Sequence, residues 1–238
     1  MTRIEVFSDA AFAFAVTMLV ISLSTIPKNY QELILAMKGI PSFAASFAVM
    51  MVVWVAHRRW SQRFGLDDGI SNMLTLALVF IVLIFVYPLK LIMDLTFYAF
   101  SRSWFPSEFA VASTTEVAGL VAFYSMGLCL VASILLGLYS RAESKADEIC
   151  LSELEGLIVR KEQQTWLVLA IAGLISTIVA LVFMNSLGYL AGITFGLVPA
   201  AFFFVTRNTG KKIKELMRDL ESKPEHPPAQ EESDEGTS

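Results

Sequence analysis

Charged residues are scarce in this chain of 238 residues. They make up 17% of the sequence, and hydrophobic residues make up 55%. A typical soluble domain has about 25% charged residues. This balance excludes a disordered chain and argues against a water-soluble enzyme. The few charges also leave long gaps between them, which is typical of membrane proteins.

Five long stretches contain no charged residue. They hold 18, 19, 21, 24 and 44 residues, starting after Asp9, Lys38, Asp68, Glu116 and Glu162 respectively. A membrane-spanning helix needs about 20 apolar residues, and polar residues at 185–188 divide the longest stretch. The chain is therefore predicted to be an all-α integral membrane protein. Its six membrane-spanning helices are expected near 8–26, 40–57, 70–92, 116–139, 165–184 and 188–206.

Basic residues fall mainly on one side of this topology. With the N-terminus inside, 14 of the 18 Lys and Arg residues lie on the inner side, which predicts that both termini are cytoplasmic. The first span is expected to stay in the protein, because no convincing signal-peptide cleavage pattern follows it. Residues 1–220 are expected to form one membrane domain. The acidic, proline-containing segment 221–238 has no large apolar residue, which predicts a disordered tail.

Cysteine and catalytic pairs are also lacking. Cys129 lies within a predicted span and Cys150 in an inner loop, so neither a disulfide nor a zinc site is expected. The spans contain no paired carboxylates, no metal-ligand cluster and no nucleophile–base pair. The sequence therefore predicts no enzyme, no cofactor and no tightly bound metal.

The connecting segments carry weaker signals. Segment 140–164 has apolar residues at near-helical spacing, which predicts an extension of the fourth span or a helix on the membrane surface. The aromatic segment 94–115 favours an interfacial belt, with a pore mouth as the alternative. Lys90 and Asp94 are four residues apart and predict a local salt bridge with a snorkelling lysine. A ladder of small residues over 188–200 predicts close helix packing.

Polar residues gather at the predicted inner ends of the first three spans. The five members of this cluster are Arg3, Ser8, Asp9, His57 and Asn72. Polar groups inside a membrane need partners or water. Two interpretations follow from their position: a structural clamp that joins three helices, or a proton relay or ion site.

One face of the first span combines apolar residues with a hydroxyl. Phe14, Thr17, Met18 and Ile21 follow the i, i+3, i+4, i+7 pattern of a helical face. The residues alone favour packing against neighbours or lipid, and pore lining is the alternative.

Several motifs occur in an order that resembles a known family. RIEVFSD at 3–9 matches the R-x-x-x-F-S-D signature of the transmembrane protein 175 family of potassium channels. Thr17, WVAH at 54–57, Asn72 and Pro88 follow in the expected order. The resemblance covers roughly the first 90 residues.

The resemblance implies a potassium-selective cation channel that lacks the glycine-rich carbonyl filter. It implies a homotetramer in a bacterial inner membrane, in which the first helix of each subunit lines the pore. The partners would be further copies of the chain and the lipid bilayer, with no nucleic acid and with potassium as the permeant ion.

The family's residue roles are carried over by position. Phe14 would form the constriction, where the family usually has isoleucine or leucine, with Met18 and Ile21 further along and Thr17 as the hydroxyl. The network that fixes this helix would consist of Arg3, Phe7, Ser8, Asp9, Trp54, His57 and Asn72. Ala10 departs from the pattern, since glycine is frequent at that position.

Three other functions stay open at this point. A proton-permeable or weakly selective cation channel would use the same pore. A secondary transporter would favour broken helices and a polar site at the middle of the membrane. A membrane adaptor would need only a binding surface.

Overall fold

The computed structural model describes residues 2–21, 27–107, 113–186 and 190, with 207, 209–211, 213–215 and 217–218. The sixth predicted span, apart from Leu190 at its start, lies outside these residues. The small-residue ladder over 188–200 and the predicted tail also lie outside them.

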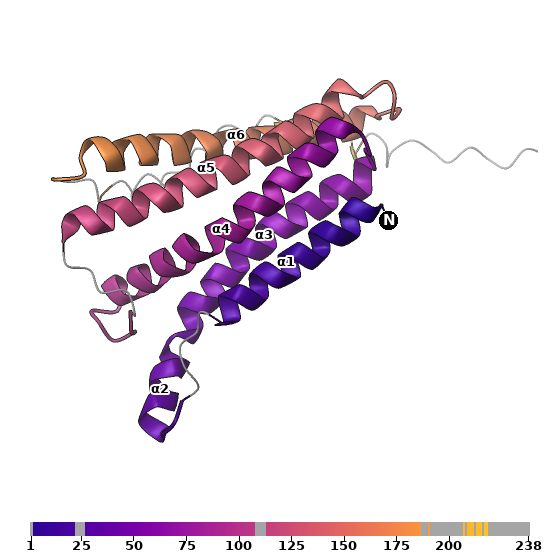
Figure 1. Cartoon of the computed structure of the whole chain (residues 1–238). Coiled ribbons are helices and arrows are strands. Elements are labelled where there is room, and N and C mark those ends of the chain that lie inside the picture. The colour runs from indigo at the N-terminus through magenta and orange to yellow at the C-terminus, as the bar shows by residue number, and fades with distance from the viewer. Residues whose placement is uncertain are drawn as a thin grey trace, which may run out of the picture.

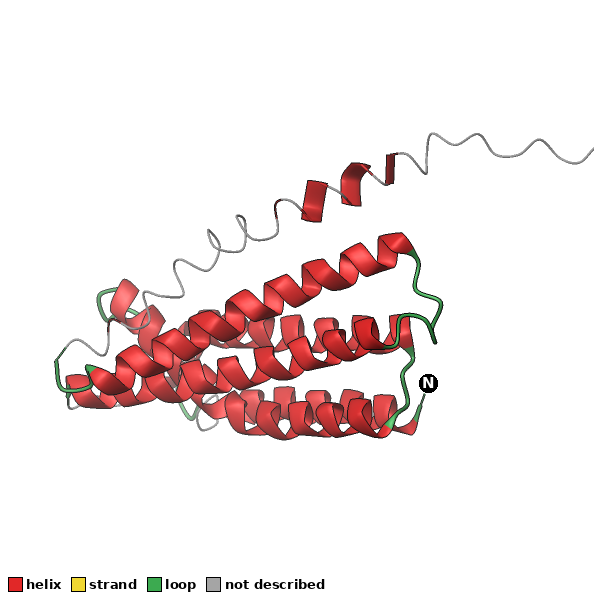
Figure 2. Ribbon diagram, turned by 90° about the horizontal axis from the view of Figure 1, so that it is seen from above, coloured by secondary structure: helices red, strands yellow, loops and turns green. Residues whose placement is uncertain are grey.

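Six helices account for most of the described chain, and these residues contain no strand. The helices are α1 (Arg3–Ile21), α2 (Tyr30–Lys38), α3 (Ile40–Phe64), α4 (Gly69–Phe100), α5 (Thr114–Ser144) and α6 (Glu153–Val182). The five long helices lie lengthwise beside one another, and the short α2 projects from one end of the bundle (Figure 1; Figure 2).

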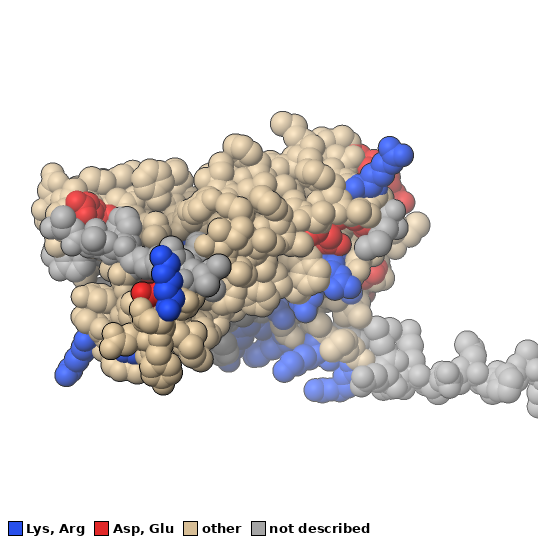
Figure 3. Space-filling model, turned by 60° about the horizontal axis from the view of Figure 1, so that its bottom comes forward, with Lys and Arg blue, Asp and Glu red and all other residues tan. Residues whose placement is uncertain are grey.

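Five helical stretches are long and apolar enough to cross a membrane, with α2 and α3 counted as one stretch. These stretches confirm the first five predicted spans. The face of the molecule drawn in Figure 3 is largely uncharged, and its charged side chains lie mostly toward the ends of the helices. The end of the bundle predicted to be cytoplasmic is called the inner end, and the opposite end is called the outer end.

Local signals explain where the helices begin and end. At Gly39 the chain passes from α2 to α3, and Pro41 occupies the first turn of α3, a position where its missing N–H is tolerated. Gly65 ends α3 with a φ of 54°, which glycine adopts without steric cost. Ser152 forms a capping box with Glu155 and starts α6 at Glu153.

This capping box changes the interpretation of segment 140–164. The helix α5 ends at Ser144 and turns connect it to α6. Residues 153–164 therefore belong to the fifth long helix, and they neither continue the fourth span nor form a separate surface helix. The predicted extension of the fourth span is confirmed for residues 140–144, which continue α5, and is wrong for residues 153–164, which belong to α6.

The helix α4 occupies the centre of the bundle and supports α1. Leu78, Val82, Phe85 and Leu89 of α4 share one buried cluster with residues of α1, α3, α5 and α6. Because α1 contributes Phe12 to this cluster, the packing of α4 determines which face of α1 stays uncovered.

The helices α5 and α6 approach each other closely. A Cβ atom on Gly173 would lie 2.9 Å from the carbonyl oxygen of Ser125, so any larger residue there would push the helices apart. The hydroxyls of Ser125 and Ser176 are 2.8 Å apart and both residues are buried. Small residues and hydroxyl pairs are common at such contacts between membrane helices.

The prediction of a snorkelling Lys90 is wrong, although the predicted salt bridge is present. Lys90 and Asp94 are 7% and 6% exposed, and the Lys90 ammonium donates to both carboxylate oxygens of Asp94. The pair faces α3, because the Ser42 hydroxyl also lies beside Asp94. The spacing of four residues correctly indicated the pair but not the face of α4 that carries it.

Candidate functional site

The exposed face of α1 is the first part of the candidate site. Its exposed residues include five at alternating spacings of three and four: Phe7, Ala10, Phe14, Thr17 and Ile21. Phe14 is 56% exposed and Ile21 is 67% exposed. The Thr17 hydroxyl donates to the carbonyl of Ala13 at 3.0 Å, so its oxygen lone pairs remain available on this face.

Met18 lies at the edge of this face. It is half-buried and packs against the core cluster. The predicted set of Phe14, Thr17, Met18 and Ile21 therefore divides into three exposed residues and one partly buried residue. Residues spaced i, i+3 and i+4 span a wide arc of a helix. The edge of this arc that contains Met18 is covered by the core cluster.

The opposite face of α1 is buried. Ser8, Phe12, Ala15 and Leu19 are at most 2% exposed, and they recur every three or four residues. This face fixes the rotation of α1, which leaves Phe14, Thr17 and Ile21 pointing away from the chain's own core.

The second part of the site lies at the inner end of α1, where α1 meets α3. The Trp54 indole donates to Asp9 Oδ1 at 2.9 Å. The Arg58 guanidinium lies 5.1 Å from the centre of the Trp54 ring, within the range of a cation–π interaction. Asp9 therefore links α1 to an aromatic–arginine stack on α3.

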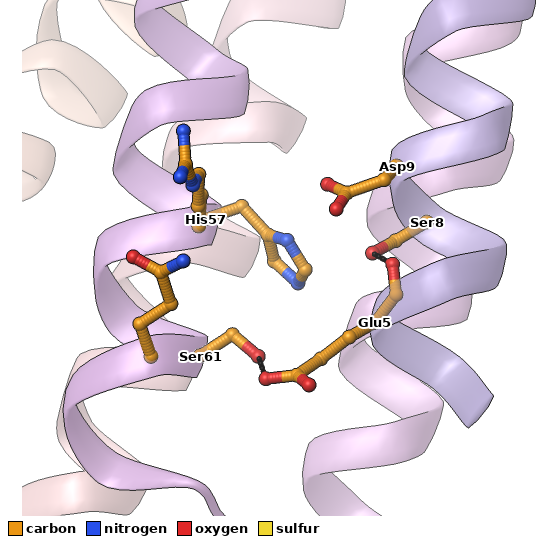
Figure 4. Close-up of a pocket in the computed structure, with 7 residues that line it drawn as sticks. Glu5, Ser8, Asp9, His57 and Ser61 are labelled. Atoms are coloured by element: carbon orange, nitrogen blue, oxygen red, sulfur yellow. Dashed lines mark hydrogen bonds between the residues drawn. The ribbon is translucent and has the colours of Figure 1, made fainter. Parts of the chain in front are cut away.

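Glu5 forms a further link to α3 that the sequence analysis missed. Its carboxylate accepts hydrogen bonds from the backbone N–H of Thr2 at 2.7 Å and from the hydroxyl of Ser61 at 2.6 Å. Ser8 donates its hydroxyl to the backbone carbonyl of Glu5 at 2.9 Å. Figure 4 shows Glu5, Ser8 and Asp9 on one side of a pocket and His57 with Ser61 on the other.

The sequence contained a signal for this link. Thr2 and Glu5 are spaced as in a capping box, and the Glu5 backbone N–H returns a hydrogen bond to the Thr2 hydroxyl at 3.3 Å. This cap explains why α1 begins at Arg3, five residues before the predicted span. The volume of the pocket beside it is about 30 Å³, which is room for about two water molecules.

His57 is buried between aromatic rings. It is 3% exposed, and its ring centre lies 6.3 Å from that of Phe12 and 6.1 Å from that of Trp60. Its Nε2 lies 3.2 Å from the hydroxyl of Thr75 on α4. His57 therefore joins α3 to α4 and contacts α1 through Phe12.

Two predicted members of the cluster do not line the pocket that contains Asp9. The amide of Asn72 donates to Asp67 Oδ1 at 2.8 Å, although Asn72 and His57 line the same small cavity. Arg3 is exposed at the start of α1. Of the five polar groups expected to converge, the structure brings Ser8, Asp9 and His57 to one pocket.

A salt bridge between α5 and Asp68, the N-cap residue of α4, completes the inner end. Arg141 donates to Asp68 Oδ2 at 2.9 Å from Nη2 and at 3.1 Å from Nε. The hydrogen bond from the Ser71 hydroxyl, followed by the interaction with Arg141, lowers the pKa of Asp68. Among the described residues, no three His, Cys, Asp or Glu side chains gather as metal ligands do.

Three comparisons relate the chain to known proteins. Residues 3–88 match the family of the endosomal/lysosomal potassium channel TMEM175. A potassium channel of Marivirga tractuosa is 44% identical over 89 residues, which cover 37% of this chain and 36% of that protein. The aligned part thus spans about a third of the length of this relative.

The structural likeness extends much further than the sequence likeness. A crystal structure of a variant of the potassium channel MtTMEM175, in complex with a nanobody–MBP fusion protein, matches with a TM-score of 0.76 and 27% identity. The match covers 89% of this chain and 94% of that chain. The membrane-spanning helices and the bacterial relative support an integral protein of a bacterial plasma membrane. These findings confirm that the chain resembles the transmembrane protein 175 family, in sequence over residues 3–88 and in fold over most of the chain.

Proposed function

We propose that the protein is a potassium-selective cation channel in which four copies surround one pore lined by α1. The observation that carries this proposal is the face of α1 with Phe14, Thr17 and Ile21, which the chain's own core leaves uncovered. The relatives described as potassium channels support the same ion.

The constriction would consist of one Phe14 side chain from each subunit. A narrow ring of apolar groups offers no ligands to an ion and resists wetting, so it blocks conduction until it widens. When water enters, partly hydrated potassium loses its shell more readily than sodium. Thr17 lies one turn along the exposed face and supplies an oxygen close to this ring.

The inner cluster would hold α1 at the correct rotation. Trp54 fixes Asp9, and Ser61 fixes the carboxylate of Glu5. Both bonds connect the first three turns of α1 to α3, and none of these four residues belongs to the proposed ion-conducting face. Their role in this proposal is to position the pore helix.

The test is potassium flux through the purified protein in liposomes. Phe14→Ala should increase leak current and weaken selectivity, because smaller side chains leave a wider, wetter constriction. Phe123→Ala is the matched control, since Phe123 is 65% exposed on α5, and its flux should equal that of the wild type.

Unchanged currents in Phe14→Ala would contradict the proposal. Reversal potentials under potassium, sodium and pH gradients then separate a potassium channel from a proton-permeable or weakly selective one. Saturable flux coupled to a counter-ion would instead indicate a transporter.

A further inference from the structure

The outer end of the bundle contains a buried ion pair that the proposed pore does not use. The side chains of Lys90 and Asp94 are 9% and 8% exposed. Replacing a buried ion pair with apolar residues of similar size is often neutral or stabilising. A contribution to folding stability therefore does not by itself explain why an ion pair is buried at this position.

The pair has a third member on another helix. Ser42 Oγ lies 2.5 Å from Asp94 Oδ1 and 3.0 Å from the carbonyl oxygen of Gly39. A hydroxyl has one hydrogen to donate, and the shorter contact to a charged acceptor is the stronger hydrogen bond. Lys90 thus orients Asp94, and Asp94 binds the corner where α2 meets α3.

A second contact holds the same corner. The Lys38 ammonium lies 4.7 Å from the centre of the Trp104 ring, and Trp104 packs edge-on against Phe105. Residues 38–42 are therefore attached both to the outer end of α4 and to the loop that follows it.

This corner lies on the path that returns from the proposed pore helix. After α1 ends at Ile21, the chain forms α2 and reaches Gly39. On the other side of the contact, α4 packs directly against α1, which contributes Phe12 to the same buried cluster. Pro88 separates that supporting part from Lys90 and removes one backbone hydrogen bond of the helix.

We propose that Ser42, Lys90 and Asp94 form an outer latch that holds the α2–α3 corner on α4 and thereby positions the outer end of α1. This inference rests on the proposed channel function. Releasing the latch gives the outer end of α1 more freedom, so the constriction at Phe14 widens more often. The three residues act as positioning residues and do not contact the ion.

Two variants release the latch while avoiding a buried unpaired charge. Ser42→Ala removes only the hydroxyl. The double variant Lys90→Met with Asp94→Leu removes both charges and keeps the apolar volume. Ser176→Ala is the matched control, because it removes a buried hydroxyl from the α5–α6 contact, away from α1.

Two readouts separate positioning from general stability. Hydrogen exchange of backbone amides over residues 39–46 should become about tenfold faster in both latch variants, the order expected for one hydrogen bond to a charged group. Potassium flux per assembled channel should rise several-fold in liposomes. Ser176→Ala should change neither quantity at these positions.

The outcomes decide the inference separately from the channel proposal. Unchanged exchange at the corner in Ser42→Ala overturns the latch, and so does faster exchange with wild-type flux in assembled channels. If the wild type conducts no potassium, the channel proposal fails instead. In that case exchange alone decides whether the latch holds the corner.

Discussion

The two ends of the bundle hold α3 in different ways. At the inner end, Asp9 and Glu5 of α1 accept hydrogen bonds from α3 beside a pocket that has room for water. At the outer end, Asp94 of α4 accepts from Ser42 of α3 in a buried setting. Water can replace a lost partner at the inner end but not in an apolar interior. Loss of such a hydrogen bond should therefore destabilise the protein less at the inner end than at the outer end.

The largest expected effect comes from breaking the outer pair on one side. Asp94→Asn keeps the shape of the side chain and leaves the Lys90 ammonium buried without a counter-charge. Removing one partner of a buried pair typically destabilises a protein by about 3–5 kcal/mol. Thermal unfolding in detergent should show this loss, and the double variant Lys90→Met with Asp94→Leu should recover most of it. Equal losses in the single and double variants would contradict the buried-charge argument.

A smaller effect is expected when the inner cluster loses a charge. Asp9→Asn should lower the fraction of assembled channel more than it alters ion preference, because a hydrogen bond to a charged acceptor contributes about 1.5–3 kcal/mol. Native mass spectrometry measures the assembled fraction, and reversal potentials measure the ion preference.

Trp54→Phe is the matched variant, since it removes the indole donor of the same bond. Combining it with Asp9→Asn should add little further loss, as expected for residues that share one interaction. A fully assembled Asp9→Asn channel with altered selectivity alone would show that Asp9 acts on the ion and not on the position of the helix.

The smallest expected effect is a pH dependence at the inner surface. The hydrogen bond from Ser71 and the interaction with Arg141 hold the pKa of Asp68 below its ordinary value of 3.8. The stabilisation is fully present above this ordinary value and is lost as the pH falls through the lower pKa of the folded state. The pair is partly exposed, so the loss should stay within about 1 kcal/mol.

Unfolding temperatures measured through the acid range should therefore fall less steeply for Asp68→Asn than for the wild type. Asp67→Asn is the control on the neighbouring carboxylate, because Asp67 is exposed and binds Asn72. If Asp68→Asn and the wild type give parallel curves, the Asp68–Arg141 pair contributes nothing to acid stability.

Features that depend on the spacing of residues could be predicted from the sequence. Features that depend on how each helix is rotated in the bundle could not. Gaps between charges located the first five spans, and a separation of four residues indicated the Lys90–Asp94 pair. Spacing alone does not say which edge of a helical face packs inward. For this reason Met18 was grouped with Phe14, and Lys90 was expected to reach the membrane surface.

Partners from loops and caps were harder to predict. Asn72 was assigned to the cluster by its depth in the membrane, but Asp67 in the preceding loop is its hydrogen-bond partner. Glu5 was overlooked although the Thr2–Glu5 spacing indicated a cap. Its bond to Ser61 joins positions 56 residues apart, and no local pattern specifies such a pairing.

Two alanines on α1 illustrate what the buried face of this helix implies. Ala15 is fully buried and Ala13, two residues earlier, is exposed. A bulkier side chain at Ala15 would force α1 to rotate about its long axis. All residues on the opposite, exposed face would then change their direction together. In the proposed channel, substitutions at residues that never contact an ion would thereby change the lining of the pore.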